Sequence, residues 1–177
     1  MYTISAITDI VSNIIFCVTG GVAIWQLLLM KKKFKADHER RKKQATIEFF
    51  YLFYKDLSEI LKSINKIFPT VNYVIKVDDI KNDSSITEMI KEYLRRITIF
   101  GVGVNTGIYD INVLDRIAET NIINSYNRFK EIIKWRRDIR NDPTLFADFD
   151  KLVSGLEETR KKRFPHDEKD LALIKGI

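Results

Sequence analysis

The sequence predicts an all-α fold, in which a single N-terminal transmembrane helix continues into a cytoplasmic helical bundle. Three observations lead to this prediction. An uncharged and mostly apolar run of 21 residues lies near the N-terminus, at positions 10–30. The chain of 177 residues has only seven Gly and three Pro, too few for the many turns of an all-β sandwich. In the remaining chain, apolar residues recur with helical spacing.

The run at 10–30 (IVSNIIFCVTGGVAIWQLLLM) has the length of a membrane helix. At about 1.5 Å per residue it would span roughly 30 Å, the thickness of a bilayer core. Asp9 precedes the run and three lysines follow it, which is the reverse of a cleaved signal peptide. The positive-inside rule then predicts that the N-terminus lies outside a bacterial inner membrane and that the helical domain is cytoplasmic.

Positive charge is concentrated directly after this run. The whole chain has a net charge of +6, and the segment 31–43 contains eight basic and two acidic residues. The basic balance therefore indicates a membrane boundary, where it sets topology and attracts lipid headgroups, more than a nucleic-acid arm. The residues with this expected role are Lys31, Lys32, Lys33, Lys35, Arg40 and Arg41.

Small and polar residues interrupt the apolar run along one helical face. Asn13, Phe16, Gly20 and Gln26 fall near this face. Because one helix cannot satisfy amide side chains in hydrocarbon, the stripe predicts a homo-oligomer within the bilayer. Two interpretations remain open: a tight helix contact without a pore, or a channel lined by these four residues. Phe16 would be a hydrophobic gate in the channel, or evidence against a water-filled one.

The segment 31–68 is expected to hold the basic run and a long linking helix. No Gly or Pro occurs between Gly21 and Pro69, so the membrane helix can continue unbroken. Apolar side chains then recur at intervals of three and four residues, as in the seam of a coiled coil or bundle. These side chains are Phe50, Phe53, Leu57, Ile60, Ile64 and Ile67.

A cytoplasmic helical domain is expected over residues 69–163. Its first part, 69–84, indicates a loop, and Ser85–Glu88 (SSITE from position 84) has the capping-box pattern that starts a helix through about Val104. The polar residues 164–177 are expected to form a tail.

Three more helices are expected in this domain. Two lie at about 111–119 and 121–141. Asp142 and Pro143 predict the cap and first turn of the third, whose apolar residues keep helical spacing as far as Leu156.

No motif in the sequence indicates an enzyme, a cofactor or a metal site. The glycine-rich stretch at 101–107 (GVGVNTG) lacks the spacing of a phosphate loop, and close helix packing with a helix end at Gly107 explains it better. A single Cys17 excludes a disulfide within the chain and a cysteine-based zinc site. His38 and His166 have no partners at metal-ligand spacing.

A basic stripe is predicted on the helix at 121–141. Basic side chains interleaved with aromatic ones can hold single-stranded nucleic acid or a nucleotide. Candidate residues for an anionic ligand are Lys130, Lys134, Arg137 and Arg140, with Arg95 and Arg96 expected nearby. The alternative is a solvated helix face, with Ile132, Trp135 and Ile139 in the core.

The stretch from Tyr93 to Leu156 resembles a bacterial family of unknown function. The shared pattern is a helix that ends near GVNTGIYD, then the Tyr- and Arg-rich helix SYNRFKEIIKWRR, then FDKLV. Members have one N-terminal span and a cytoplasmic helical domain, and they look like prophage or defence-island proteins. The chain is also similar to membrane effectors of Hailong-type anti-phage systems. That resemblance implies an oligomeric channel held shut by short single-stranded DNA from a partner nucleotidyltransferase.

The sequence therefore leads to three functional expectations. The first is a channel-forming membrane effector of abortive-infection defence, regulated by an anionic ligand. The second is a membrane-tethered interaction or superinfection-exclusion protein with no pore. The third is a helical domain that binds nucleic acid by itself.

Overall fold

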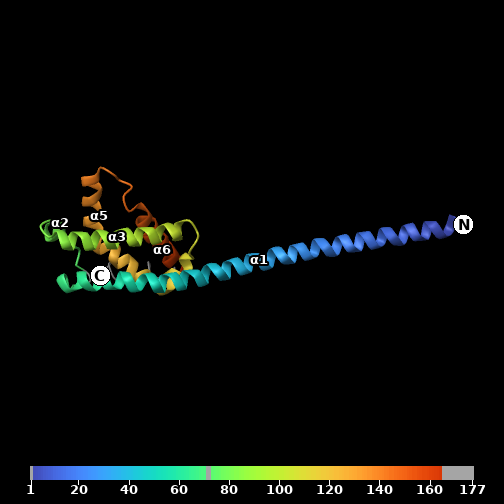
Figure 1. The fold of residues 1–177 in the computed structure, drawn as a ribbon, viewed down its shortest axis with the longest axis horizontal. Helices are drawn as coiled ribbons and strands as arrows, with labels where there is room; N and C mark the ends of the chain where they lie inside the picture. The colour runs from blue at the N-terminus through green and yellow to red at the C-terminus, as the bar shows by residue number, and fades with distance from the viewer. Residues whose placement is uncertain (1, 71–72, 165–177) are drawn as a thin grey trace, which may run out of the picture. The chain divides into compact units, whose positions relative to one another are not determined.

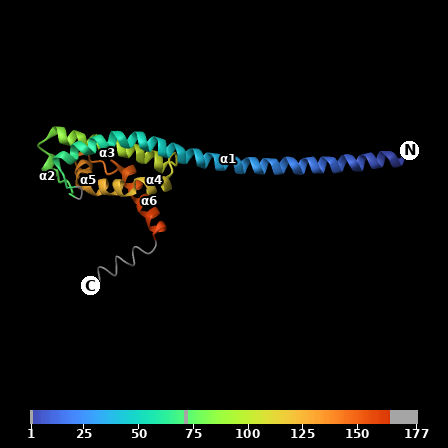
Figure 2. The same ribbon diagram turned by 90° about the horizontal axis from the view of Figure 1, so that it is seen from below.

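The computed structural model describes residues 2–70 and 73–164, and within these ranges the side chains of Phe16 and of residues from 18 onward. All elements of the described residues are helices, as Figures 1 and 2 show, so the all-α prediction is confirmed. The chain divides into two compact units, Met1–Arg41 and Lys42–Ile177. The helices are α1 (Tyr2–Ile67), α2 (Val77–Ile80), α3 (Ser84–Asn105), α4 (Ile111–Ile117), α5 (Glu119–Arg140) and α6 (Ala147–Arg163).

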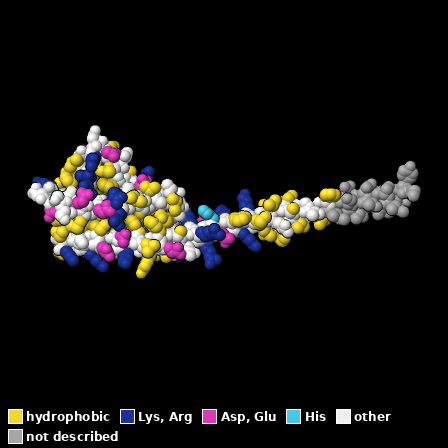
Figure 3. Space-filling model, in the orientation of Figure 1, with side chains coloured by type: hydrophobic (Ala, Val, Ile, Leu, Met, Phe, Trp, Pro, Cys, Tyr) yellow, Lys and Arg dark blue, Asp and Glu magenta, His cyan; other side chains and the backbone are white. Residues whose placement is uncertain are grey.

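The first unit consists of the N-terminal part of α1. Its described side chains are all exposed, including Phe16 at 75% and Trp25 at 61%. Figure 3 shows apolar side chains along this helix, followed by a gathering of Lys and Arg. Among the described residues, no helix is both long and apolar enough to cross a membrane. Asn13 lies outside the residues whose side chains are described.

The second unit has a hydrophobic core to which α1 contributes its C-terminal part. Phe50, Leu57 and Ile64 are buried, and Phe53 and Ile60 pack against the core. The predicted seam is therefore confirmed over these five positions. Its sixth member, Ile67, is 44% exposed, because α1 ends there.

Large aromatic side chains join α1 to α3 and to the segment before α4. Phe100 of α3 stacks on Phe49 and Phe53 of α1, at centroid distances of 5.9 and 5.1 Å. Tyr109 stacks on Phe49 at 4.8 Å. These contacts explain Phe49 and Phe53 of α1 as packing residues, whereas Tyr51 between them is 77% exposed.

Two glycines of the stretch at 101–107 allow close packing around α3. A Cβ on Gly101 would lie 2.6 Å from the carbonyl oxygen of Asp148 in α6, and one on Gly103 would lie 2.4 Å from the ring of Tyr109. Gly107 has a φ of 79° just beyond the end of α3, a conformation that glycine adopts without strain. These contacts support the packing explanation of the glycine-rich stretch.

Two predicted helix starts are wrong. α3 begins two residues early, because its N-cap is Asp83 and not Ser85, and the Asp83 side chain accepts hydrogen bonds from the amides of Ser85 and Ile86. α6 begins only at Ala147. Asp142 instead accepts hydrogen bonds from the amide and hydroxyl of Thr144 in a turn. Phe146 then has a φ of 63°, which an α-helix does not permit, so the helix starts after it.

The segment predicted as a loop at 69–84 contains the short helix α2. Ile80 of α2 and Ile75 just before it are fully buried, and the amide of Ile75 donates a 3.0 Å hydrogen bond to the carbonyl of Arg128 in α5. The predicted tail at 164–177 lies outside the described residues except for Phe164.

Candidate anion-binding sites

Helix α5 carries the predicted basic stripe, and its four residues lie in different surroundings. Lys130 and Lys134 are exposed, and so is Arg140 in the last turn. A cation in that turn is favourable beside the negative end of the helix dipole. Arg137 is half-buried. The four residues therefore do not form one continuous exposed surface.

Arg137 connects α5 to α6 and to the turn before it. Its Nη2 lies 2.5 Å from Oδ2 of Asp150, and its Nε donates to the carbonyl of Leu145 at 2.8 Å. The other Asp150 oxygen accepts a 2.9 Å hydrogen bond from the Tyr126 hydroxyl. Burial and this bond raise the pKa of Tyr126. The Arg137 guanidinium thus has a structural role in the described fold.

Arg95 and Arg96 of α3 both bind the carboxylate of Glu92. Arg95 uses Nε and Nη2, each at 2.9 Å, and Arg96 uses Nε at 2.6 Å. Arg96 also reaches Asp56 of α1 at 3.2 Å. The hydrogen bonds from the two guanidinium groups lower the pKa of Glu92 to about 2. Glu92 is therefore ionised at neutral pH and neutralises part of their charge.

An open hollow of about 550 Å³ brings two of the predicted residues, Arg95 and Arg140, together. Lys91 and Arg136 add two further cations that the prediction did not include. We call this site the arginine hollow. It is lined by Glu88, Lys91, Glu92, Arg95, Arg136, Arg140, Asp142, Leu145 and Phe146. The other predicted residues, Lys130, Lys134, Arg137 and Arg96, do not line it.

Arg136 and Arg140 are the cations of the arginine hollow that are open to a ligand. Neither forms an ion pair within the described part of the chain, whereas Lys91 pairs with Glu88 and Arg95 with Glu92. The Arg136 guanidinium lies 5.9 Å from the ring centroid of Trp135, and its Nε is buried without a hydrogen-bond partner among the described residues. The hollow can therefore attract an anion mainly through these two arginines.

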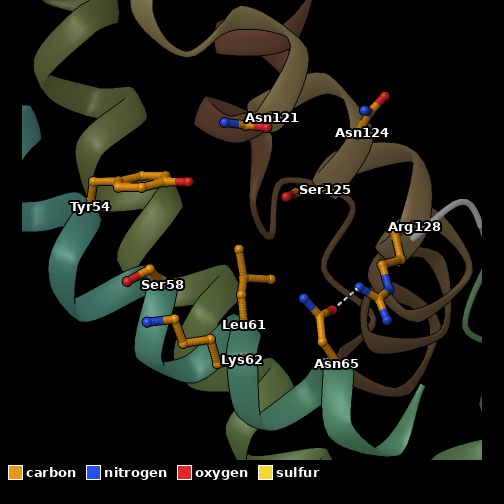
Figure 4. A pocket seen from close by; sticks show the side chains of 9 residues that line it. All are labelled: Tyr54, Ser58, Leu61, Lys62, Asn65, Asn121, Asn124, Ser125 and Arg128. Carbon is orange, nitrogen blue, oxygen red and sulfur yellow. Dashed lines mark hydrogen bonds between the residues drawn. The ribbon is translucent and has the colours of Figure 1, made fainter. Parts of the chain in front are cut away.

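A second site, a groove of about 240 Å³, lies between α1 and α5 (Figure 4). We call it the polar groove. Its lining has two cations, Lys62 and Arg128, and no carboxylate. Six neutral side chains with hydrogen-bonding groups and one leucine complete it. The lining residues are Tyr54, Ser58, Leu61, Lys62, Asn65, Asn121, Asn124, Ser125 and Arg128.

Arg128 is buried, with 5% of its surface exposed. Its Nη1 donates to the Asn65 side-chain oxygen at 2.5 Å, and its Nη2 donates to the carbonyl of Phe68 at 2.6 Å. Its Nε has no partner among the described residues. Burial lowers the pKa of Arg128. Figure 4 shows the side chain reaching from α5 to Asn65 on α1.

The sequence contained one signal for Arg128 that the prediction did not use. Arg128 precedes Ile132 by four residues and follows Ser125 by three, so it lies on the buried face of α5. A basic residue on that face needs hydrogen-bond partners from another helix, so its position indicates a specific structural or binding role.

The residues predicted for the bilayer lie in the first unit. Phe16, Gly20 and Gln26 are exposed, and beyond the adjacent backbone of α1 a Cβ on Gly20 would have no neighbour within 4 Å. Lys31, Lys32, Lys33, Lys35, Arg40 and Arg41 are exposed as well. Elsewhere in the described residues, no group of His, Cys, Asp or Glu could hold a metal ion.

Comparison with known proteins gives one match. A family described as a domain of unknown function (DUF4760) matches residues 13–156, which is most of the chain. No curated protein and no solved structure matches. The expected membership in a family of unknown function is confirmed, and the chain belongs to the DUF4760 family.

Proposed function

We propose that the protein is a membrane-anchored effector whose helical domain binds an anionic regulator. The observation that carries this proposal is the exposure of the apolar side chains from Phe16 to Met30. Exposed apolar area on this scale is costly in water, and a bilayer would remove that cost. The exposed basic residues that follow, at 31–43, are suited to anionic lipid headgroups.

Self-association within the bilayer is the second part of the proposal. A Cβ on either Gly20 or Gly21 would have no neighbour within 4 Å, so another helix can approach closely there. Gln26 is exposed on the single helix, and its amide needs a polar partner in hydrocarbon. A homo-oligomer supplies that partner. Asn13, Phe16, Gly20 and Gln26 would then line a channel.

The regulator would bind in the arginine hollow. Arg136 and Arg140 favour an anion, and Phe146 in the lining of the hollow provides an aromatic side chain. A short single-stranded DNA or a nucleotide fits this combination. The resemblance to effectors of Hailong-type systems supports a role in anti-phage defence, at the bacterial inner membrane. In cells, phage challenge with and without the protein tests that role.

Membrane extraction and conductance test the first two parts. Full-length protein should stay in the pellet after alkaline extraction of membranes, and release into the supernatant would overturn the anchor. Purified protein in planar bilayers should conduct ions. Replacing both Asn13 and Gln26 by Leu should abolish conductance, whereas the matched apolar change Ile24→Val should not. A lack of conductance in every ligand state would favour the alternative, a membrane-tethered interaction protein without a pore.

Fluorescence anisotropy with a labelled short single-stranded oligonucleotide tests the regulator site. Binding should weaken as salt rises, because phosphate contacts release counterions. Arg136→Gln with Arg140→Gln should weaken binding by about tenfold or more, since each removes a charge-assisted contact. Lys66→Gln, an exposed basic residue outside the hollow, is the control. Equal affinity in both variants would remove the hollow from the proposal.

A further inference from the structure

We propose that the polar groove between α1 and α5 binds a small phosphate monoester, whose phosphate group is held by Arg128, while Lys62 adds positive charge on the other side of the groove. This site is distinct from the arginine hollow, and the inference does not depend on membrane attachment or on a channel.

The polar groove carries positive charge that no carboxylate in its lining balances. Three more exposed arginines of the second unit pair with carboxylates: Arg95 with Glu92, Arg137 with Asp150 and Arg163 with Asp115. Arg128 is more buried than these, yet its hydrogen-bond partners among the described residues are a neutral amide and a carbonyl. A buried cation without a counter-ion is costly, so an anion that enters the groove removes part of that cost.

Arg128 has more hydrogen-bond donors than its two bonds within the described structure use. A guanidinium has five N–H donors, and Arg128 uses two of them on Asn65 and Phe68. These two bonds also close the C-terminal end of α1, where exposed carbonyls favour a cation. This structural role uses one N–H of Nη1 and one N–H of Nη2. Donors therefore remain for oxygens of a ligand, within the described structure.

The size and lining of the polar groove indicate the class of ligand. A phosphate monoester carries a charge near −2 at neutral pH, which matches the two cations of the groove. A monocarboxylate matches only one of them. Asn121, Asn124 and Ser58 offer neutral donors and acceptors for the hydroxyl groups of a sugar-sized remainder. A volume of about 240 Å³ is sufficient for a ligand of this size.

A ligand in this groove would connect two helices. Ser58, Lys62 and Asn65 belong to α1, whereas Asn121 and Arg128 belong to α5. Binding would therefore hold the C-terminal part of α1 against the rest of the second unit, and it would stabilise the folded state by an amount that rises with the logarithm of ligand concentration above Kd.

Calorimetric titration of the full-length chain in detergent tests the inference, with ribose 5-phosphate as the probe. Ribose 5-phosphate and inorganic phosphate should bind. Ribose should not bind, and acetate should bind at least about tenfold more weakly, since it lacks the second charge. Lys62→Gln should weaken ribose 5-phosphate binding by about tenfold, because it removes one of the two cations of the groove. Lys66→Gln, one turn further along α1 and outside the groove, should leave binding unchanged.

Arg128→Lys provides a second variant, and it should also weaken binding, because a lysine cannot reproduce the planar donor set. Since Arg128 supports α1, circular dichroism is used to check that the Arg128→Lys variant is folded. If it is not folded, the Lys62→Gln variant, which changes an exposed side chain, tests phosphate binding alone. The inference is overturned if neither phosphate binds, if acetate binds as tightly, or if Lys62→Gln and Lys66→Gln behave alike. Because this assay needs no bilayer, its failure is distinct from a failure of the membrane anchor.

Discussion

The hydroxyl of Thr46 in α1 accepts a 2.8 Å hydrogen bond from the backbone N–H of Asp110, the N-cap of α4. Thr46 is fully buried, and Asp110 is 5% exposed. The same hydroxyl donates to the carbonyl of Lys42 at 2.7 Å. One threonine within a long helix therefore satisfies a buried amide that is 64 residues away along the chain.

Replacing Thr46 by Val should destabilise the second unit. The isostere fills the same space but leaves the Asp110 N–H buried without an acceptor, at a cost of about 1–3 kcal/mol. The free energy of unfolding in urea, measured on detergent-solubilised protein, gives this value. Thr98→Val is the matched control, because the Thr98 hydroxyl only bonds Leu94 in its own helix. Equal losses in both variants would contradict the importance of the link between α1 and α4.

Gly101→Ala should destabilise the contact between α3 and α6. The new methyl would lie 2.6 Å from a backbone oxygen of Asp148, so one helix must move. We expect a loss of about 1–3 kcal/mol in the free energy of unfolding, as for other overpacked sites. Gly155→Ala is the comparison, because its methyl would meet only the end of the Ile111 side chain, at 2.7 Å. That side chain can rotate, and the helix propensity of Ala offsets up to about 1 kcal/mol. Gly155→Ala should therefore cost clearly less than Gly101→Ala.

The sequence predicted those parts of the fold that depend on the spacing of residues close together in the chain. The 3-4 spacing from Phe50 to Ile64 predicted the buried face of α1, because a helix of regular period places those residues together. The helix starts were harder, since Asp83 and Ser85 both can cap and lie two residues apart. The start of α6 depends on the positive φ of Phe146. A positive φ is unusual for a bulky aromatic residue, so the sequence does not predict it.

The candidate sites followed from the sequence only in part. The spacing of Arg137 and Arg140 placed them on one helix, but it could not reveal that Asp150 of α6 would bind the first of them. The buried position of Arg128 depends on Asn65 and Phe68, which lie 63 and 60 residues earlier in the chain. Contacts of this range arise from helix packing, and one sequence does not encode them as a local pattern.

Arg137→Gln should destabilise the fold more than Lys134→Gln. Arg137 is only 23% exposed at its side chain, and it binds both Asp150 and the carbonyl of Leu145. Its removal leaves a partly buried carboxylate without its cation, so we expect a loss of about 1–3 kcal/mol. Lys134 is exposed and forms no ion pair among the described residues, so its change should stay within about 0.5 kcal/mol. Thermal unfolding of the two variants beside the unaltered chain measures the difference. A larger loss for Lys134→Gln would show that the stripe has a structural role that these contacts do not explain.

The ion-pair cluster around Glu92 should make stability depend on pH in the acid range. Arg95 and Arg96 lower the pKa of Glu92 from 4.5 to about 2. Because the folded-state pKa lies below the unfolded value, the contribution is fully present above about pH 4.5 and is lost as the pH falls towards about 2. Glu92 is one-third exposed, so solvent screening limits the contribution to about 1 kcal/mol. The difference in unfolding free energy between the unaltered chain and Glu92→Gln should therefore be largest near neutral pH and shrink through this window. Glu59→Gln, which removes an exposed carboxylate with no ion pair in the described residues, should show no such difference. A Glu92→Gln difference that stays constant with pH would mean that the two guanidinium groups do not stabilise the carboxylate.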